Sequence, residues 1–311
     1  MKKRIITGSI LILILTPIFI LEPLMPLFLV VMFLFAGMAS YEIMTLKKEE
    51  HTPIFITVIV IILTLITTAA ASLWMSKGLV NDKYSDFFNK VKEYDFFPVL
   101  AVAPFVIMGL FITTPKFKIE LLARAIISIM YVGLAFASLI TIRLMDVSII
   151  VYLFLITILT DTFAYIFGSK FGKTQMSKNI SPKKTWEGAI AGTVIATILA
   201  GLFGLFLGPA SASSNYNSIL SIFSSLGTKE KYIQALVMIP LTFFSSIIAQ
   251  IGDLVGSKLK RSYDIKDFGT IFPGHGGVMD RFDSALFVSM FLVIVFMLIS
   301  FAFPLSEVII F

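Results

Sequence analysis

Acidic, basic and glycine residues gather in one stretch of the chain, residues 250–283. An apolar segment ends in Gln250-Ile251-Gly252-Asp253, and the next begins with Asp280-Arg281-Phe282-Asp283. The spacing of Asp280 and Asp283, i and i+3, puts both carboxylates on one face of a helix. Carboxylates at the ends of two antiparallel helices can converge on one hard cation, and Mg²⁺ prefers one or two carboxylates with phosphate oxygens and water. This stretch therefore predicts a metal-assisted reaction at phosphate.

The segment between these acids supplies the complementary groups for a polyphosphate. Its glycines let the backbone come close to a phosphate with exposed N–H groups; they are Gly274, Gly276 and Gly277. Its cations would neutralise phosphate charge; they are Lys260, Arg261, Lys266 and Arg281. His275 has two open interpretations, a contact to phosphate or pyrophosphate and a hydrogen bond that stabilises a turn.

A second polar cluster lies inside an apolar segment. Asp161 precedes the expected end of its helix by about two turns, and Tyr165 and Gly168 share its face at i+4 and i+7. A carboxylate at such a depth in a bilayer costs on the order of 3 kcal/mol on insertion scales, so it usually serves a function. The alternative is a structural partner for a polar group of another helix.

A third cluster is the basic loop 169–187. It combines hydroxyls and ammonium groups just before a helix, where backbone N–H groups and the helix dipole favour an anion. The candidate substrate-binding residues are Lys170, Ser181, Lys183, Lys184 and Thr185. The alternative is a loop whose charges only set membrane topology, with Thr185 as the N-cap of the following helix.

These clusters together predict phosphoryl or nucleotidyl transfer onto a lipid. A phosphate monoester has a second pKa of about 6, so a lipid phosphate is largely ionised at neutral pH. It can attack the α-phosphorus of a nucleoside triphosphate without a dedicated general base. Catalysis then reduces to positioning and to charge stabilisation by metal and cations.

The composition places this chemistry in a membrane. Of the 311 residues 58% are hydrophobic and only 14% are charged, against about a quarter charged in soluble domains, and the mean hydropathy is +0.96. The absence of cysteine excludes disulfides, thiolate metal sites and cysteine nucleophiles. We attribute the net charge of +6 to topology and lipid phosphates, and expect no nucleic-acid partner.

The apolar segments predict an all-α polytopic membrane protein. Each is near the ~20 residues needed to cross the hydrocarbon core. The nine expected spans are 4–21, 24–44, 53–74, 97–115, 121–143, 147–168, 187–208, 232–256 and 281–303. The first follows Met1-Lys2-Lys3-Arg4 and lacks a small-x-small cleavage site, so we expect it to be retained as a span.

Charge bias orients these spans. Of the 25 lysines and arginines, 17 fall on the side of the N-terminus, 7 on the other side, and Arg124 lies within a span. The positive-inside rule makes the N-terminal side, which carries all three polar clusters, cytoplasmic. On the opposite side, residues 82–97 and 217–226 have apolar side chains near helical spacing. Interfacial helices and flexible linkers are both open for these two segments.

Residues 257–283 resemble the signature of the phosphatidate cytidylyltransferases. The matching pattern is Ser257-x-Leu259-Lys260-Arg261, then Lys266-Asp267-x-Gly269, then Phe272-Pro273-Gly274-His275-Gly276-Gly277-Val278-x-Asp280-Arg281-Phe282-Asp283. Asp161-x-x-Ala164-Tyr165-x-x-Gly168 and Ser181-Pro182-Lys183-Lys184-Thr185-x-Glu187-Gly188 also resemble segments of that family. The matches cover about 147–300, whereas the first 140 residues share only an apolar, multispan character.

The resemblance implies a specific reaction and set of roles. CTP and phosphatidate would be the substrates, and CDP-diacylglycerol and pyrophosphate the products. Mg²⁺ would be the cofactor, with a second cation such as K⁺, in a homodimer of a bacterial inner membrane. The resemblance makes Asp253 and Asp280 the best metal ligands, followed by Asp283 and Asp161. The catalytic residues would be Asp253, Asp280, Lys260, Arg261 and Arg281, and Lys266, His275, Gly276 and Gly277 would join the substrate-binding residues of the basic loop.

On this basis the expected organisation has three parts. Residues 1–95 hold N-terminal helices for anchoring or dimer contact and an outer-side linker, 96–146 a middle helix pair, and 147–311 a catalytic membrane domain.

Three other classes of protein compete with this interpretation. A secondary transporter would place its polar groups at the bilayer midplane, whereas these gather in loops at one face. A phosphatidyl-alcohol transferase that consumes CDP-diacylglycerol would carry Asp-Gly-x-x-Ala-Arg, which is absent from the sequence. A membrane scaffold would leave the three clusters without a purpose.

Overall fold

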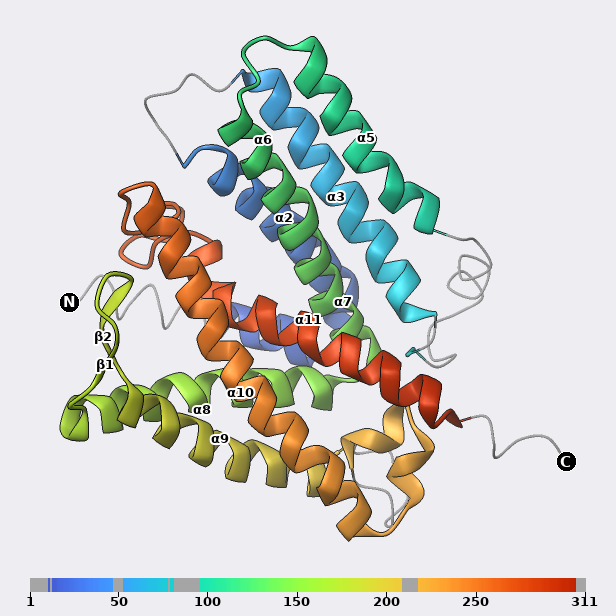
Figure 1. The fold of residues 1–311 in the computed structure, drawn as a ribbon. Helices are drawn as coiled ribbons and strands as arrows, with labels where there is room; N and C mark the ends of the chain where they lie inside the picture. Colours follow the sequence, from blue (N-terminus) through green and yellow to red (C-terminus); the bar gives the residue numbers. More distant parts are fainter. Residues whose placement is uncertain are drawn as a thin grey trace, which may run out of the picture. The chain divides into compact units, whose positions relative to one another are not determined.

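The computed structural model is helical throughout its long elements (Figure 1). It describes residues 11, 13–46, 53–77, 79–80, 96–208 and 218–305. Within these, seven helical segments are long and apolar enough to cross a membrane, and Pro98–Thr113 is a shorter apolar one. The all-α polytopic prediction is therefore confirmed. Of the predicted first span 4–21, residues 11 and 13–20 are helical and residues 4–10 and 12 lie outside the described residues, as do residues 82–95 of the segment 82–97.

The chain divides into two compact units. One comprises Met1–Lys77, Asp82–Thr141 and Leu259–Phe282, and is called unit 1 below. The other, unit 2, comprises Gly78–Asn81, Ile142–Lys258 and Asp283–Phe311.

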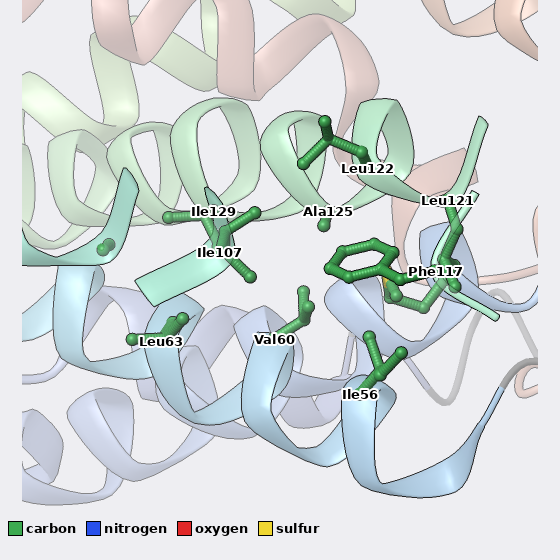
Figure 2. Close-up of a cluster of buried hydrophobic side chains, with 11 residues drawn as sticks. Ile56, Val60, Leu63, Ile107, Phe117, Leu121, Leu122, Ala125 and Ile129 are labelled. Atoms are coloured by element: carbon green, nitrogen blue, oxygen red, sulfur yellow. The ribbon is translucent and has the colours of Figure 1, made fainter. Parts of the chain in front are cut away.

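Unit 1 is built on three main helical spans. They are α2 (Met25–Met44), preceded by the short helix η1 (Glu22–Leu24), α3 (Ile54–Ser76), and the span formed by α6 (Ile119–Ile126), the π-helix η2 (Ile127–Val132) and α7 (Gly133–Met145), whose residues up to Thr141 belong to unit 1. The shorter α5 (Phe97–Thr113) lies beside α3. Figure 2 shows their apolar core, in which Ile56, Val60 and Leu63 of α3 face Phe117 and Ile129.

Polar contacts join these helices inside the unit. Ser128 Oγ donates to Ser40 Oγ at 2.6 Å, and Ser40 Oγ lies 3.2 Å from Thr64 Oγ1. Arg124, only 1% exposed, donates from Nη1 to the carbonyl of Met44 at 2.9 Å. That carbonyl lies in the last turn of α2, which has no intrahelical donor for its carbonyls. Arg124 therefore fixes the C-terminal end of α2.

Unit 2 is organised around the pair α8 (Val147–Phe171) and α9 (Trp186–Phe206), which run side by side (Figure 1). A Cβ on Gly192 would lie 2.5 Å from the carbonyl oxygen of Thr160, and a Cβ on Gly188 would collide with that of Ala164. Small residues allow two membrane helices to approach this closely. The two helices are joined through the antiparallel strands β1 (Gln175–Ser177) and β2 (Ser181–Thr185).

The remaining helices of this part of the chain are α10 (Lys231–Ser262) and α11 (Met279–Ala302), whose residues up to Lys258 and from Asp283 belong to unit 2. They approach each other at Gly252, where a Cβ would lie 2.8 Å from the Cβ of Phe287.

The segment after residue 217 differs from both interpretations of it. It forms two short 3-10 helices, η3 (Ile219–Ile222) and η4 (Ser225–Thr228), each capped by a serine hydroxyl. Ile219 and Leu220 are fully buried and the ring of Phe223 packs on that of Phe296 at 4.4 Å. These apolar side chains therefore pack inside unit 2, where Phe296 of α11 covers Phe223.

Candidate functional site

Asp280 stands in the first turn of α11 and is almost fully enclosed by donors. Its Oδ1 accepts from Lys260 Nζ at 2.7 Å, and its Oδ2 accepts from the backbone N–H groups of Phe268 at 2.7 Å and Gly277 at 2.9 Å. The side chains of Lys260 and Asp280 are 12% and 3% exposed. An ionised carboxylate accepts about four hydrogen bonds, so three of its positions are occupied within unit 1.

The loop before α11 has the conformation that its glycines permit. Gly274 and Gly276 have φ angles of 77° and 82°, a region that other residues rarely adopt. Phe272 N donates to Gly276 O at 2.9 Å, and a Cβ on Gly276 would lie 2.7 Å from Asp280 Oδ2. The glycines that we predicted to admit a phosphate thus already admit a carboxylate of the protein, which uses the N–H of Gly277.

The basic loop of unit 2 is a β-hairpin fastened at its base. Thr185 is the N-cap of α9 and accepts from Gly188 N at 3.3 Å. The capping role is confirmed, whereas the role of the loop's charges stays a prediction. Glu187 accepts the N–H of Thr174 at 3.1 Å and 3.2 Å, and Trp186 N donates to Thr174 O at 3.0 Å. The hairpin therefore presents its lysines from a defined position at the end of α8 and α9.

Asp253 of α10 meets this hairpin. Its Oδ2 forms an ion pair with Lys184 of β2, and both side chains are 28% exposed. Its Oδ1 accepts from Ser257 Oγ at 3.4 Å. Asp161 of α8 interacts electrostatically with both Asp253 and Lys184. Unit 2 thus brings together one residue from each of three predicted clusters.

Hydroxyl and amide groups link α8, α9 and α10 below these charges. Thr160 Oγ1 lies 2.7 Å from Ser246 Oγ, which donates to Thr193 Oγ1 at 3.3 Å. Gln250 Nε2 donates to the same Thr193 oxygen at 2.8 Å. Interhelical hydrogen bonds of this kind stabilise helix packing in membranes, and here they fix α10 one turn before Asp253.

One protein family and one relative of known activity match almost the whole chain. Residues 2–299 match the Cytidylyltransferase family. The phosphatidate cytidylyltransferase of Bacillus subtilis (strain 168) is 31% identical over 301 residues, covering 94% of this chain and 96% of the relative. The chain belongs to the Cytidylyltransferase family. It is therefore a nucleotidyltransferase.

Shorter matches cover part of the chain. The phosphatidate cytidylyltransferase of Staphylococcus haemolyticus (strain JCSC1435) is 38% identical over 166 residues, covering 53% of this chain and 55% of the relative. That of Staphylococcus aureus (strain COL) is 34% identical over 190 residues, covering 61% and 65%. These matches agree with the family that the signature at 257–283 resembles.

Three other predicted residues have side chains that contact the protein itself or are buried in it. Arg261 Nη1 donates to Ile265 O at 3.0 Å, Asp283 packs its carboxylate against Gly256, and the Nδ1 atom of His275 is buried without a hydrogen-bond partner among the described residues. The rest lie at the surface or are half-buried, as a substrate contact requires: Lys170, Ser181, Lys183, Lys266 and Arg281.

Sequence reasoning missed residues that hold the polar clusters in place within each unit. Glu42 accepts the N–H groups of Val278 at 2.8 Å and Met279 at 3.0 Å, although it stands 236 and 237 positions away. The sequence feature that could have revealed Glu42 is its position as an acidic residue near the end of an apolar segment. A weaker feature could have revealed the polar network of Thr160, Thr193 and Ser246: the polar residues Thr242, Ser246 and Gln250 recur at i, i+4 and i+8 on one face of the same helix.

Asp253 and Asp161 have the chemistry that a hard cation requires. Mg²⁺ takes one or two carboxylates and completes its shell with phosphate oxygens and water, and Lys184 already stands as a cation beside both. An ion pair as exposed as Lys184–Asp253 is worth on the order of 1 kcal/mol, so an incoming metal can replace it at little cost. Among the described residues no group of three or more acidic or histidine side chains is close enough to hold a metal alone. The sequence prediction that Asp253 and Asp280 share one cation is untested, and the three donors already held by Asp280 favour Asp253 and Asp161 as the ligands.

Proposed function

We propose that the chain joins CTP to phosphatidate, making CDP-diacylglycerol and pyrophosphate, as an integral enzyme of a bacterial cytoplasmic membrane with its site facing the cytoplasm. The observation that carries this proposal is the match along 94% of the chain to a phosphatidate cytidylyltransferase. The chemistry of the clusters supports it, because basic and acidic residues stand near the ends of apolar helices, where we expect a soluble nucleotide to meet a lipid headgroup.

The reaction needs positioning more than proton transfer. An ionised oxygen of phosphatidate attacks the α-phosphorus of CTP, a new P–O bond forms, and the bond to the β-phosphate oxygen breaks to release pyrophosphate. Lys183 and Lys184 of the hairpin would hold one anionic substrate, and Lys260 would stabilise charge that develops on phosphate oxygens. Asp253 and Asp161 would hold Mg²⁺, which when bound neutralises phosphate charge. A second cation such as K⁺ and a homodimeric assembly belong to the same proposal.

The direct assay follows pyrophosphate release in detergent. Purified protein receives CTP, phosphatidate and Mg²⁺, and we expect release that requires both substrates and stops when EDTA removes the metal. Release that persists in EDTA would contradict the metal requirement. No release over a range of lipid and salt conditions would contradict the proposed function.

Lys183→Ala is expected to raise the apparent KM for an anionic substrate by about tenfold with little change in kcat. Lys183 is exposed on β2, and a hydrogen bond to a charged group contributes about 1.5–3 kcal/mol. Steady-state kinetics with CTP and phosphatidate varied in turn measure the effect. Lys178→Ala, which changes another exposed lysine in the turn of the same hairpin, is the matched control. Equal kinetics for both variants would contradict a substrate contact by Lys183 and favour a role in membrane topology.

A further inference from the structure

Glu42 is an acidic side chain inside the protein. It belongs to the last turn of α2 and is 2% exposed. Its Oε1 accepts from Val278 N and its Oε2 from Met279 N, at 2.8 Å and 3.0 Å. These are N–H groups at the beginning of α11, which have no intrahelical acceptor and carry the partial positive charge of the helix dipole. Glu42 thus caps a helix 236 residues further along the chain.

The glycine loop is shaped around this carboxylate. A Cβ on Gly269 would lie 2.5 Å from Glu42 Oε1, and a Cβ on Gly277 would collide with both carboxylate oxygens. Any other residue at these two positions would have to push Glu42 away. The two glycines of the loop therefore serve the approach of Glu42, in the same way that Gly276 serves the approach of Asp280.

The contacts of Glu42 and those of Asp280 involve neighbouring peptide groups. Asp280 Oδ2 accepts from Gly277 N and Phe268 N, and these residues adjoin Val278 and Gly269, which Glu42 contacts. Since Oδ1 of Asp280 holds Lys260, the position of the Lys260 ammonium depends on the same peptide groups. A displacement of these peptide groups would therefore move both the carboxylate of Asp280 and the ammonium of Lys260.

The end of the helix that carries Glu42 is itself fixed by a buried arginine. Arg124 donates to the carbonyl of Met44, two residues after Glu42, and its guanidinium lies 5.8 Å from the centre of the Tyr263 ring. Supporting contacts of this kind are what keep a reactive group within the small tolerance that catalysis allows.

We infer that Glu42 is a positioning residue of the reaction centre, which fixes the first turn of α11 and the glycine loop so that Asp280 presents Lys260 to the substrate phosphates. The inference rests on the proposed function for its catalytic consequence, whereas the holding of the loop can be tested without it.

The test compares Glu42→Gln with Glu120→Gln, the same chemical change at an exposed glutamate in the first turn of α6. Hydrogen exchange is measured at the amides of residues 277–280. In Glu42→Gln an amide NH₂ faces one of the two donors, so we expect the amides of Val278 and Met279 to exchange at least about tenfold faster, with no change in Glu120→Gln. Unchanged exchange would overturn the inference, whatever the activity.

The second test measures the steady-state kinetics of the folded, monodisperse variants. We expect Glu42→Gln to lower kcat at least about tenfold and Glu42→Asp, which keeps a carboxyl group on a shorter stem, to lower it less. In an Asp280→Asn background Glu42→Gln should change the residual rate less than about twofold, because a residue that acts through another adds nothing once that one is lost. Fully additive losses, or wild-type kcat in Glu42→Gln, would overturn the positioning role. An inactive wild type would instead refute the proposed function, and the exchange arm would still decide whether Glu42 holds the loop.

Discussion

Asp280→Asn is expected to lower the turnover of the enzyme by about 10²-fold or more while the chain remains folded. The asparagine oxygen can accept from only part of the donor set, and its NH₂ group would face Lys260 or a backbone N–H. Removing one electrostatic group from a reaction centre costs about 10²–10³ in rate. Pyrophosphate release per folded protein measures the loss, and size-exclusion chromatography with circular dichroism verifies the fold.

The matched control for this variant is Asp264→Asn. Asp264 is exposed in the same unit and has a φ angle of 52°, which asparagine adopts readily. We expect wild-type turnover in the control. Wild-type turnover in Asp280→Asn as well would remove Asp280 from the site.

Asp253→Asn is expected to lower turnover as much as Asp280→Asn does, but its turnover should recover partly when the Mg²⁺ concentration is raised. Asp253 shares its ion pair with Lys184 at 28% exposure and acts electrostatically on Asp161. Because we propose it as a ligand of Mg²⁺, its loss should weaken metal binding, so that a higher Mg²⁺ concentration restores part of the rate. Asp280, whose oxygens already hold three donors, should show no such recovery.

The Mg²⁺ dependence of the two variants, measured side by side, separates ligand from positioning roles. Asp146→Asn is the control in unit 2, since asparagine serves equally well as the N-cap of α8. Recovery of Asp280→Asn with Mg²⁺ would make Asp280 a metal ligand, as its place in the signature implies. Failure of Asp253→Asn to recover at any Mg²⁺ concentration would remove Asp253 from the metal site.

The long helices could be predicted from the sequence because a bilayer imposes their length. The expected spans 24–44 and 147–168 correspond to Met25–Met44 and Val147–Phe171. The expected 97–115 corresponds to a helix of 17 residues, α5, which is too short to count among the seven candidate spans. The β-hairpin was not predicted, because strands as short as Gln175–Ser177 among lysines have no apolar alternation to reveal them.

The chemistry of the site could be predicted from residue types, but its geometry could not. The ion pair of Lys184 with Asp253 joins two predicted residues 69 positions apart, and nothing in their local sequence selects that partner. Glu42 was missed for the same reason, since its hydrogen bonds reach residues 278 and 279. A glycine can be predicted to permit a close approach, but Gly277 does not reveal that the approaching group is a carboxylate of the protein.

The most direct measurement of the central claim follows the fate of labelled CTP. Purified enzyme in detergent is given phosphatidate, Mg²⁺ and CTP labelled with ³²P at either the α- or the γ-phosphate, and the chloroform-soluble lipid is counted. Cytidylyl transfer predicts that the α-label enters the lipid while the γ-label stays in water as pyrophosphate. Entry of the γ-label into the lipid, or of neither label, would contradict the account.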